Sequence, residues 1–115
     1  MATHIVTKVL VRPNTSTDWP WEDSGVNGFA DIGDDVMTNA NSVSADGLTH
    51  TSVQTWASKE QLENLVINKN NSTFSSASAT NRNYMAANNI SGRSTSGDGT
   101  VSIFDSSSKA WAIQE

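Results

Sequence analysis

VSADGLTHTSVQTWASKEQ (residues 43–61) is the stretch that decides the fold. Asp46 and Gly47 stand between two segments rich in Thr, Ser and Val, and Asp-Gly is a preferred pair for a two-residue type I′ hairpin turn, whose central residues both have φ > 0. Ser58 and Gln61, three residues apart, match a capping box, which starts a helix. The stretch therefore predicts two antiparallel strands joined by a tight turn and followed by a helix.

The turn also sets the register of the hairpin, because a slip of one residue would move every side chain to the other face of the sheet. Counting outward from the turn predicts four cross-strand pairs: Ala45 with Leu48, Val43 with His50, Ala40 with Val53, and Met37 with Trp56. We expect Met37 and Trp56 on one face, and Ala40 and Val53 on the other.

The segments before the hairpin predict a strand and a poorly formed helix. Residues 4–12 carry apolar side chains on both faces, which is typical of a central or covered strand. A short helix over residues 22–32 is expected to be irregular, because Gly25 and Gly28 both weaken it.

The segments after the hairpin predict two helices and a last strand. The helix that follows Ser58 places Leu62, Leu65 and Val66 on one stripe. A second helix is expected over residues 73–88, followed by a polar loop over residues 91–99. Residues 99–104 predict the last strand.

The order of these elements is β-α-β-β-α-β, which is that of a ferredoxin-like sandwich. We therefore expect an α+β fold with an antiparallel sheet and a first helix that is short or irregular. At 115 residues the chain is expected to form a single domain over residues 1–115. Residues 1–104 would form its core, and residues 105–115 a C-terminal strand or an arm that docks on a neighbour.

The composition predicts a thin hydrophobic core. Leu, Ile, Val and Phe make up 22 of the 115 residues, whereas Ser, Thr, Asn and Gly make up 48. A net charge of −5 is too small to favour disorder. Such a domain gains much from burying surface against neighbours, which favours a subunit of an assembly.

The charge distribution and the missing residue types exclude several classes of function. The sequence between Arg12 and Lys59 holds seven acidic residues and no Lys or Arg, so this half would repel a phosphate backbone, and nucleic acid is not an expected partner. No segment approaches the roughly 20 apolar residues of a membrane span, so we expect no membrane association. The chain has no cysteine and therefore no disulfide or thiolate nucleophile.

No motif in the sequence predicts catalytic chemistry or a bound cofactor. The two histidines, His4 and His50, lack metal-ligand spacing and are expected to be ordinary strand residues, although strand pairing could bring them together. The acidic run of Asp31, Asp34 and Asp35 lacks the order of a calcium loop and favours a solvated patch that faces a basic partner. We expect no catalytic, metal or cofactor site.

The four tryptophans are the main candidates for contacts. Trp56 and Trp111 are expected to anchor the core or an interface. Trp19 and Trp21 flank Pro20 in an acidic loop and are hard to bury locally. Since Trp is enriched at binding hot spots, these two would either contact a partner or cap the sheet.

Three short motifs resemble the small virion-associated proteins of tailed bacteriophages, notably those of marine cyanobacteria. They are residues 11–15 (VRPNT), residues 45–49 (ADGLT) with residues 56–58 (WAS), and residues 84–90 (YMAANNI). The resemblance covers residues 5–90, and the chain departs from it in its poor first helix and its Ser/Gly-rich end. It implies a ferredoxin-like domain without catalytic residues.

We therefore expect a non-enzymatic structural subunit located in a bacteriophage particle, such as a capsid decoration protein or a tail or neck component. Its expected partners are other virion proteins and further copies of itself. The residues expected to make these contacts are Trp19, Trp21, Asp31, Asp34, Asp35, Trp111 and Ile113.

Two alternatives remain open at this point. One is a cofactor-free dimeric α/β-barrel enzyme of the monooxygenase or isomerase kind, with His50, Tyr84 and Trp56 in a pocket between sheet and helices. The other is a glycan-binding module that stacks sugars on Trp19 and Trp21.

Overall fold

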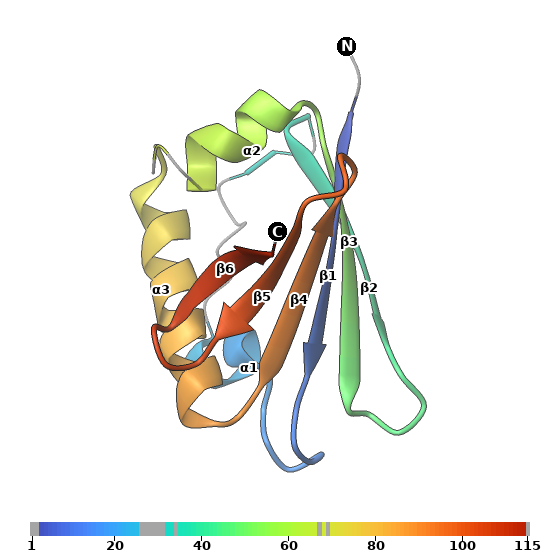
Figure 1. The fold of residues 1–115 in the computed structure, drawn as a ribbon, viewed down its shortest axis with the longest axis vertical. Helices are drawn as coiled ribbons and strands as arrows, with labels where there is room; N and C mark the ends of the chain where they lie inside the picture. Colours follow the sequence, from blue (N-terminus) through green and yellow to red (C-terminus); the bar gives the residue numbers. More distant parts are fainter. Residues whose placement is uncertain (1–2, 26–31, 34, 67, 69, 115) are drawn as a thin grey trace.

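The computed structural model describes residues 3–25, 32–33, 35–66, 68 and 70–114. Six strands form one sheet in the order β2-β3-β1-β4-β5-β6, and every neighbouring pair is antiparallel. The described helices lie on one side of this sheet (Figure 1). The elements in chain order are β1 (His4–Val11), α1 (Pro20–Ser24), β2 (Met37–Val43), β3 (Thr49–Trp56), α2 (Lys59–Val66), α3 (Ser72–Ala87), β4 (Ser91–Ser96), β5 (Val101–Asp105) and β6 (Ala110–Gln114).

The expected α+β class with an antiparallel sheet is confirmed, whereas the ferredoxin-like arrangement is not. Two strands, β5 and β6, extend the sheet beyond β4, and two helices, α2 and α3, connect β3 to β4. The first helix, α1, has only five residues. Part of the expected range of this helix, residues 26–31, lies outside the described residues. The C-terminal segment, expected as a strand or a docking arm, pairs with β5 as strand β6.

The hairpin has the predicted register but not the predicted turn. The structure pairs Met37 with Trp56, Ala40 with Val53, and Val43 with His50, as expected. Gly47 has a φ of 76°, but Asp46 does not have the positive φ that a type I′ turn requires. Instead the Asp46 carboxylate accepts hydrogen bonds from the Ser44 hydroxyl and the Leu48 N–H, which stabilises a longer loop over residues 45–48. The ladder therefore ends before the predicted Ala45–Leu48 pair.

Local capping explains where the two longer helices begin. The Ser58 hydroxyl accepts a hydrogen bond from the Gln61 N–H at 3.2 Å, and α2 starts at the next residue, Lys59. The Asn71 side chain caps α3 by accepting from the N–H of Phe74 at 3.0 Å, so this helix begins one residue before the expected start.

The packing of α2 differs in part from the predicted stripe. Leu65 is buried and Leu62 is half-buried against the same core cluster. Val66 is 53% exposed, because α2 turns this side chain away from the sheet.

The prediction of a polar loop over residues 91–99 was wrong, because residues 91–96 form strand β4. This strand pairs with β1 on one side and β5 on the other, so backbone hydrogen bonds stabilise it despite its small polar side chains. Gly92 lies opposite Leu10, beneath the ring of Trp111. A Cβ at Gly92 would overlap that ring, so the position requires glycine.

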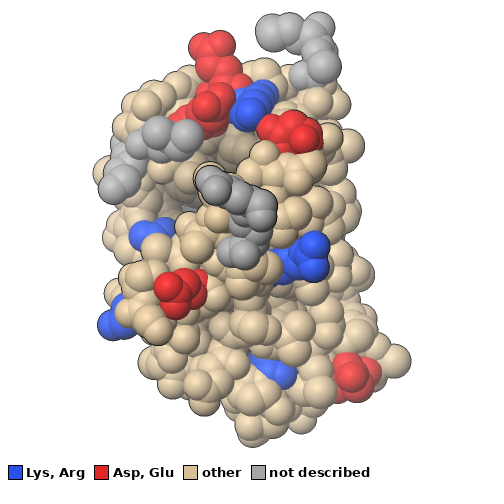
Figure 2. Space-filling model, in the orientation of Figure 1, with Lys and Arg blue, Asp and Glu red and all other residues tan. Residues whose placement is uncertain are grey.

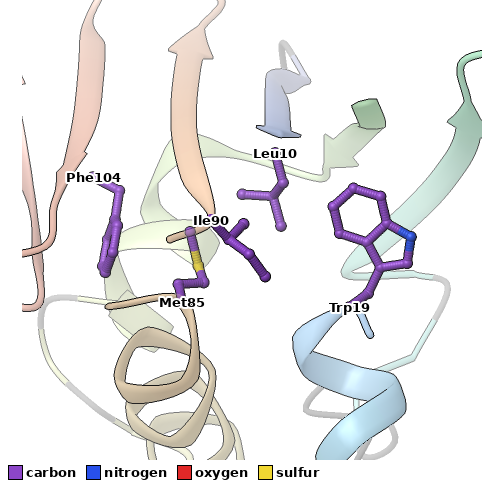
Figure 3. Packing of buried hydrophobic residues seen from close by; sticks show 5 residues of the cluster. All are labelled: Leu10, Trp19, Met85, Ile90 and Phe104. Carbon is purple, nitrogen blue, oxygen red and sulfur yellow. The ribbon is translucent and has the colours of Figure 1, made fainter. Parts of the chain in front are cut away.

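The core lies between the sheet and the helices and consists of two clusters. Figure 3 shows the first, in which strand, loop and helix side chains converge: Leu10, Trp19, Met85, Ile90 and Phe104. The second cluster lies toward the other end of the sheet and contains Val6, Met37, Trp56 and Leu65. Between the two clusters the inner face of the sheet carries polar residues, and this stretch forms the candidate site.

Candidate functional site

A cavity of about 870 Å³ lies between the inner face of the sheet and helices α1 and α3. Strands β1, β2 and β3 form its floor, α3 forms one wall, and Trp21 and Trp111 contribute aromatic rings. Its volume falls within the range of roughly 300–1,000 Å³ that is typical of small-molecule sites.

The floor is polar because alternate residues of β3 point toward the helices. His50, Ser52 and Gln54 are all buried, at 5–9% exposure, on the same face as Trp56. The Ser52 hydroxyl donates to Asn39 Oδ1 at 2.6 Å, and Trp56 Nε1 donates to Gln54 Oε1 at 3.2 Å. Side-chain hydrogen bonds therefore hold this floor in place.

Helix α1 places two tryptophans around His50. Pro20 stands at the first helical position, and Glu22 accepts a hydrogen bond from the Trp19 N–H at 2.9 Å. The rings of Trp19 and Trp21 stack at 5.8 Å between centroids, and the His50 ring lies 4.6 Å from that of Trp21. Burial lowers the pKa of His50, and the nearby Glu22 carboxylate opposes this shift.

Two cationic side chains reach the cavity from opposite sides. Lys8 of β1 is half-buried, and its Nζ lies 5.0 Å from the centroid of the Trp111 ring. Arg82 of α3 donates from Nη1 to the Ser78 hydroxyl at 2.6 Å. Burial lowers the pKa of Lys8, and the positive charge of Arg82 lowers it further.

The described residues that line the cavity include no Asp or Glu. One acceptor in the wall, Asn81 Oδ1, is buried and has no hydrogen-bond partner among the described residues. The arrangement thus offers two basic side chains, a polar floor and aromatic sides. Chemically it can hold a small molecule that brings its own negative charge.

The tryptophans expected to contact partners occupy different positions. Trp19 is only 5% exposed and contributes to the core, and the Arg12 guanidinium lies over its ring at 4.6 Å from the centroid. Trp21 is half-buried and lines the cavity. Trp111 is half-buried against Phe104, with ring centroids 5.6 Å apart. Trp19 and Trp21 stack on each other, and of the two rings only that of Trp21 is accessible.

The remaining expected contact residues lie apart from this cavity. Ile113 of β6 is 67% exposed, and Asp35 is exposed before β2. Asp31 and Asp34 lie outside the described residues. The role of all these residues in partner contacts stays a prediction.

The structure brings only some of the residues expected in a metal site or in an enzyme pocket to the cavity. His4 pairs with Trp56 and His50 pairs with Leu10, so the two histidines lie at opposite ends of the β1–β3 ladder. His50 lines the cavity, whereas Tyr84 and the fully buried Trp56 do not. No group of three or more His, Cys, Asp or Glu side chains that could hold a metal occurs in the described part of the chain.

Sequence reasoning missed Lys8 and Arg82 as site residues. The strand pattern held a signal for Lys8, because alternation places it between the buried Val6 and Leu10. No comparable signal pointed to Arg82, since the polar helix α3 does not reveal from its sequence which side faces the sheet.

Comparisons with known proteins do not identify a relative. No protein-family model, curated protein or solved structure matches the chain. Among the described helices, none has the length and apolar character needed to cross a bilayer.

Proposed function

We propose that this protein is a non-enzymatic structural subunit of a bacteriophage particle that buries the outer face of its sheet against a second copy and other parts of its surface against other proteins of the particle. The outer face is the side of the sheet that points away from α1, α2 and α3 (Figure 1). The observation that carries this proposal is the composition of that face.

The outer face is neutral and rich in β-branched side chains. Its largest exposed apolar residues are Ile5, Val11, Val53 and Ile103, at 37–44% exposure. The other outward positions of β1 and β3 hold Thr or Val. The exposed face of a sheet usually carries polar side chains, and an exposed apolar patch commonly marks a site of protein contact. This face is therefore typical of a surface that another protein covers.

Charge is sparse on this face and self-complementary. Among the described strand residues, those with outward charged side chains are Arg93 on β4 and Asp105 on β5. A twofold interface brings the same surface of both copies together, so one cation and one anion can pair in both directions. Figure 2 shows scattered charged groups and a largely uncharged surface in the view that it draws.

The flat area of the outer face approaches that of a standard protein interface. Six strands about 4.8 Å apart, each with about six residues of about 3.3 Å, give roughly 570 Å² for a flat sheet, and the side chains that project from it add to this area. A standard interface buries about 800 Å² on each partner. The thin core adds to the benefit of such burial.

The resemblance to small phage proteins supports a position in the particle, as a capsid decoration protein or a tail or neck component. The acidic residues around Asp35 would face a basic partner surface there. A mass-spectrometric inventory of purified particles tests this location. Detection of the chain at a fixed copy number supports the proposal, and its absence from intact particles contradicts it.

We also propose that β1, α1, β2, β3, α3 and β4 form a split β-α-β core of the ferredoxin-like kind, extended by β5 and β6. The order β2-β3-β1-β4 supports this interpretation. A truncation after Ser96 tests it, since an independent core would keep the circular dichroism of a folded α+β protein.

The cavity beside His50 favours a second candidate, the cofactor-free dimeric α/β-barrel enzyme. Burial lowers the pKa of His50 and so favours its neutral form, which could accept a proton from a bound substrate. Oxygen uptake with phenolic or quinol substrates, lost in His50→Ala and kept in His4→Ala, would support this candidate. Absence of turnover across such substrates would contradict it.

A further inference from the structure

We propose that the cavity between the sheet and α3 binds a small amphipathic anion, with a carboxylate or phosphate head between Lys8 and Arg82 and an apolar body against α3. This inference is independent of the proposed role of the outer face. It assigns a ligand-binding site on the opposite side of the sheet.

The charge balance of the cavity favours an anionic ligand. The protein has a net charge of −5, yet the described lining residues include Lys8 and Arg82 and no acid. The one ion pair among the described residues, Lys59–Asp98, lies on the surface. Two cations near each other and partly removed from water are unfavourable unless an anion joins them. A bound anionic group would supply that counter-charge.

The two basic side chains keep hydrogen-bond donors that a ligand can use. Lys8 Nζ lies over the Trp111 ring, and Arg82 donates from Nη1 to Ser78. A guanidinium has five N–H donors in a planar fork that matches a carboxylate or phosphate. Contacts with an aromatic ring and one hydroxyl leave donors on both groups for a ligand.

The rest of the lining defines the body of the ligand. Phe74, Ala77 and Met85 of α3 present apolar side chains to the cavity, and Trp21 adds an aromatic ring. The buried acceptor Asn81 Oδ1 lies in the same wall without a partner. An unpaired buried acceptor is costly, so a donor on the ligand would be favoured there. The chemistry fits an alkyl or aryl anion rather than a highly polar one.

Titration of the full chain with four ten-carbon probes tests this proposal. Decanoate and decyl phosphate carry anionic heads, decanol is the neutral control, and decyltrimethylammonium is the cationic control. Isothermal titration calorimetry gives affinity and stoichiometry, and amide chemical shifts locate the site. We expect one anionic probe per chain at an affinity at least about tenfold above that of decanol, since a charge-assisted hydrogen bond contributes roughly 1.5–3 kcal/mol. Binding of only one anionic probe identifies the head group.

Variants of the two walls separate this site from general hydrophobic binding. Lys8→Met removes the charge and keeps the apolar stem, so it should weaken anion binding at least about tenfold and leave decanol binding unchanged. Asn81→Asp adds a negative charge to the opposite wall and should have the same effect. Lys59→Met, the matched change on the exposed surface, should alter neither affinity.

Three results would overturn the proposal. They are equal affinity for decanoate, decyl phosphate and decanol, binding without saturation, and unchanged anion affinity in both Lys8→Met and Asn81→Asp. Thermal unfolding of each variant shows that it is folded, and if one of the two does not fold, the other decides the test. None of these measurements depends on whether the chain dimerises.

Discussion

Replacing Val53 by lysine provides the sharpest test of the outer face. Val53 lies on β3 and pairs with Thr7 of β1, and its side chain is 37% exposed in the single chain. At an exposed strand position this substitution should lower the free energy of unfolding of the monomer by less than about 1 kcal/mol. In a sheet-to-sheet dimer the same lysine would be buried.

The expected effect on association is much larger. A twofold interface contains position 53 twice, so each dimer would bury two lysines. We take the free-energy cost of burying each lysine as only about 2 kcal/mol, because the long side chain can place its ammonium near the rim of the interface. The two lysines together then weaken the dimer by about 4 kcal/mol. Since each 1.4 kcal/mol is a factor of ten, the dimer Kd should rise roughly 1,000-fold.

Val66→Lys is the matched control. Val66 is 53% exposed on α2, on the side of the sheet opposite to the outer face, so the same change should leave the Kd within about threefold of wild type. Sedimentation equilibrium over a wide concentration range measures all three proteins. A monomeric wild-type chain, or equal effects of the two lysines, would refute the reasoning.

Three further predictions concern the fold. Gly92→Ala should lower the free energy of unfolding, measured with urea, by about 1–3 kcal/mol, because the added Cβ overlaps the Trp111 ring. A second substitution, Trp111→Leu, should restore part of that loss. Failure of this rescue would contradict the contact. Gly47→Ala should lower the free energy of unfolding by about 1–2 kcal/mol, because Gly47 has a φ of 76°. Gly97→Ala should lower it less, because the φ of Gly97 is not positive. Equal losses in the two variants would contradict the loop geometry. Burial lowers the pKa of His50, so the unfolded chain binds more protons near its ordinary pKa of about 6.5, and stability should fall as the pH drops below that value, by at most about 1.4 kcal/mol per pH unit. His50→Gln should reduce this slope in urea unfolding between pH 7 and 5, and an unchanged slope would contradict the assignment.

The hairpin shows how much local sequence can predict. The positions of Met37 and Trp56 follow from a turn signal and a two-residue alternation, and the register was correct although the turn type was not. The predicted pairs survived because a longer loop over residues 45–48 keeps the same alignment. The caps at Ser58 and Asn71 likewise act within three residues of the chain.

Tertiary contacts decide the parts that the sequence did not predict. β4 consists of Ser, Gly, Arg and Thr, and its strand structure depends on pairing with β1 and β5. The cavity combines Lys8 with Arg82, which are 74 positions apart in the sequence, and no local pattern relates them. Of the candidate residues, the sequence identified Trp21, Trp111 and His50, but not the positive charges beside them.

The placement of the tryptophans gives the cavity an intrinsic optical reporter. Trp21 and Trp111 line it, whereas Trp19 and Trp56 are buried in the two core clusters. The ammonium of Lys8 over the Trp111 indole makes the emission of that ring sensitive to any molecule that displaces or neutralises it. Binding in the cavity should therefore change the unlabelled fluorescence, and Trp111→Phe is the variant that removes the contribution of this ring while Trp21 remains.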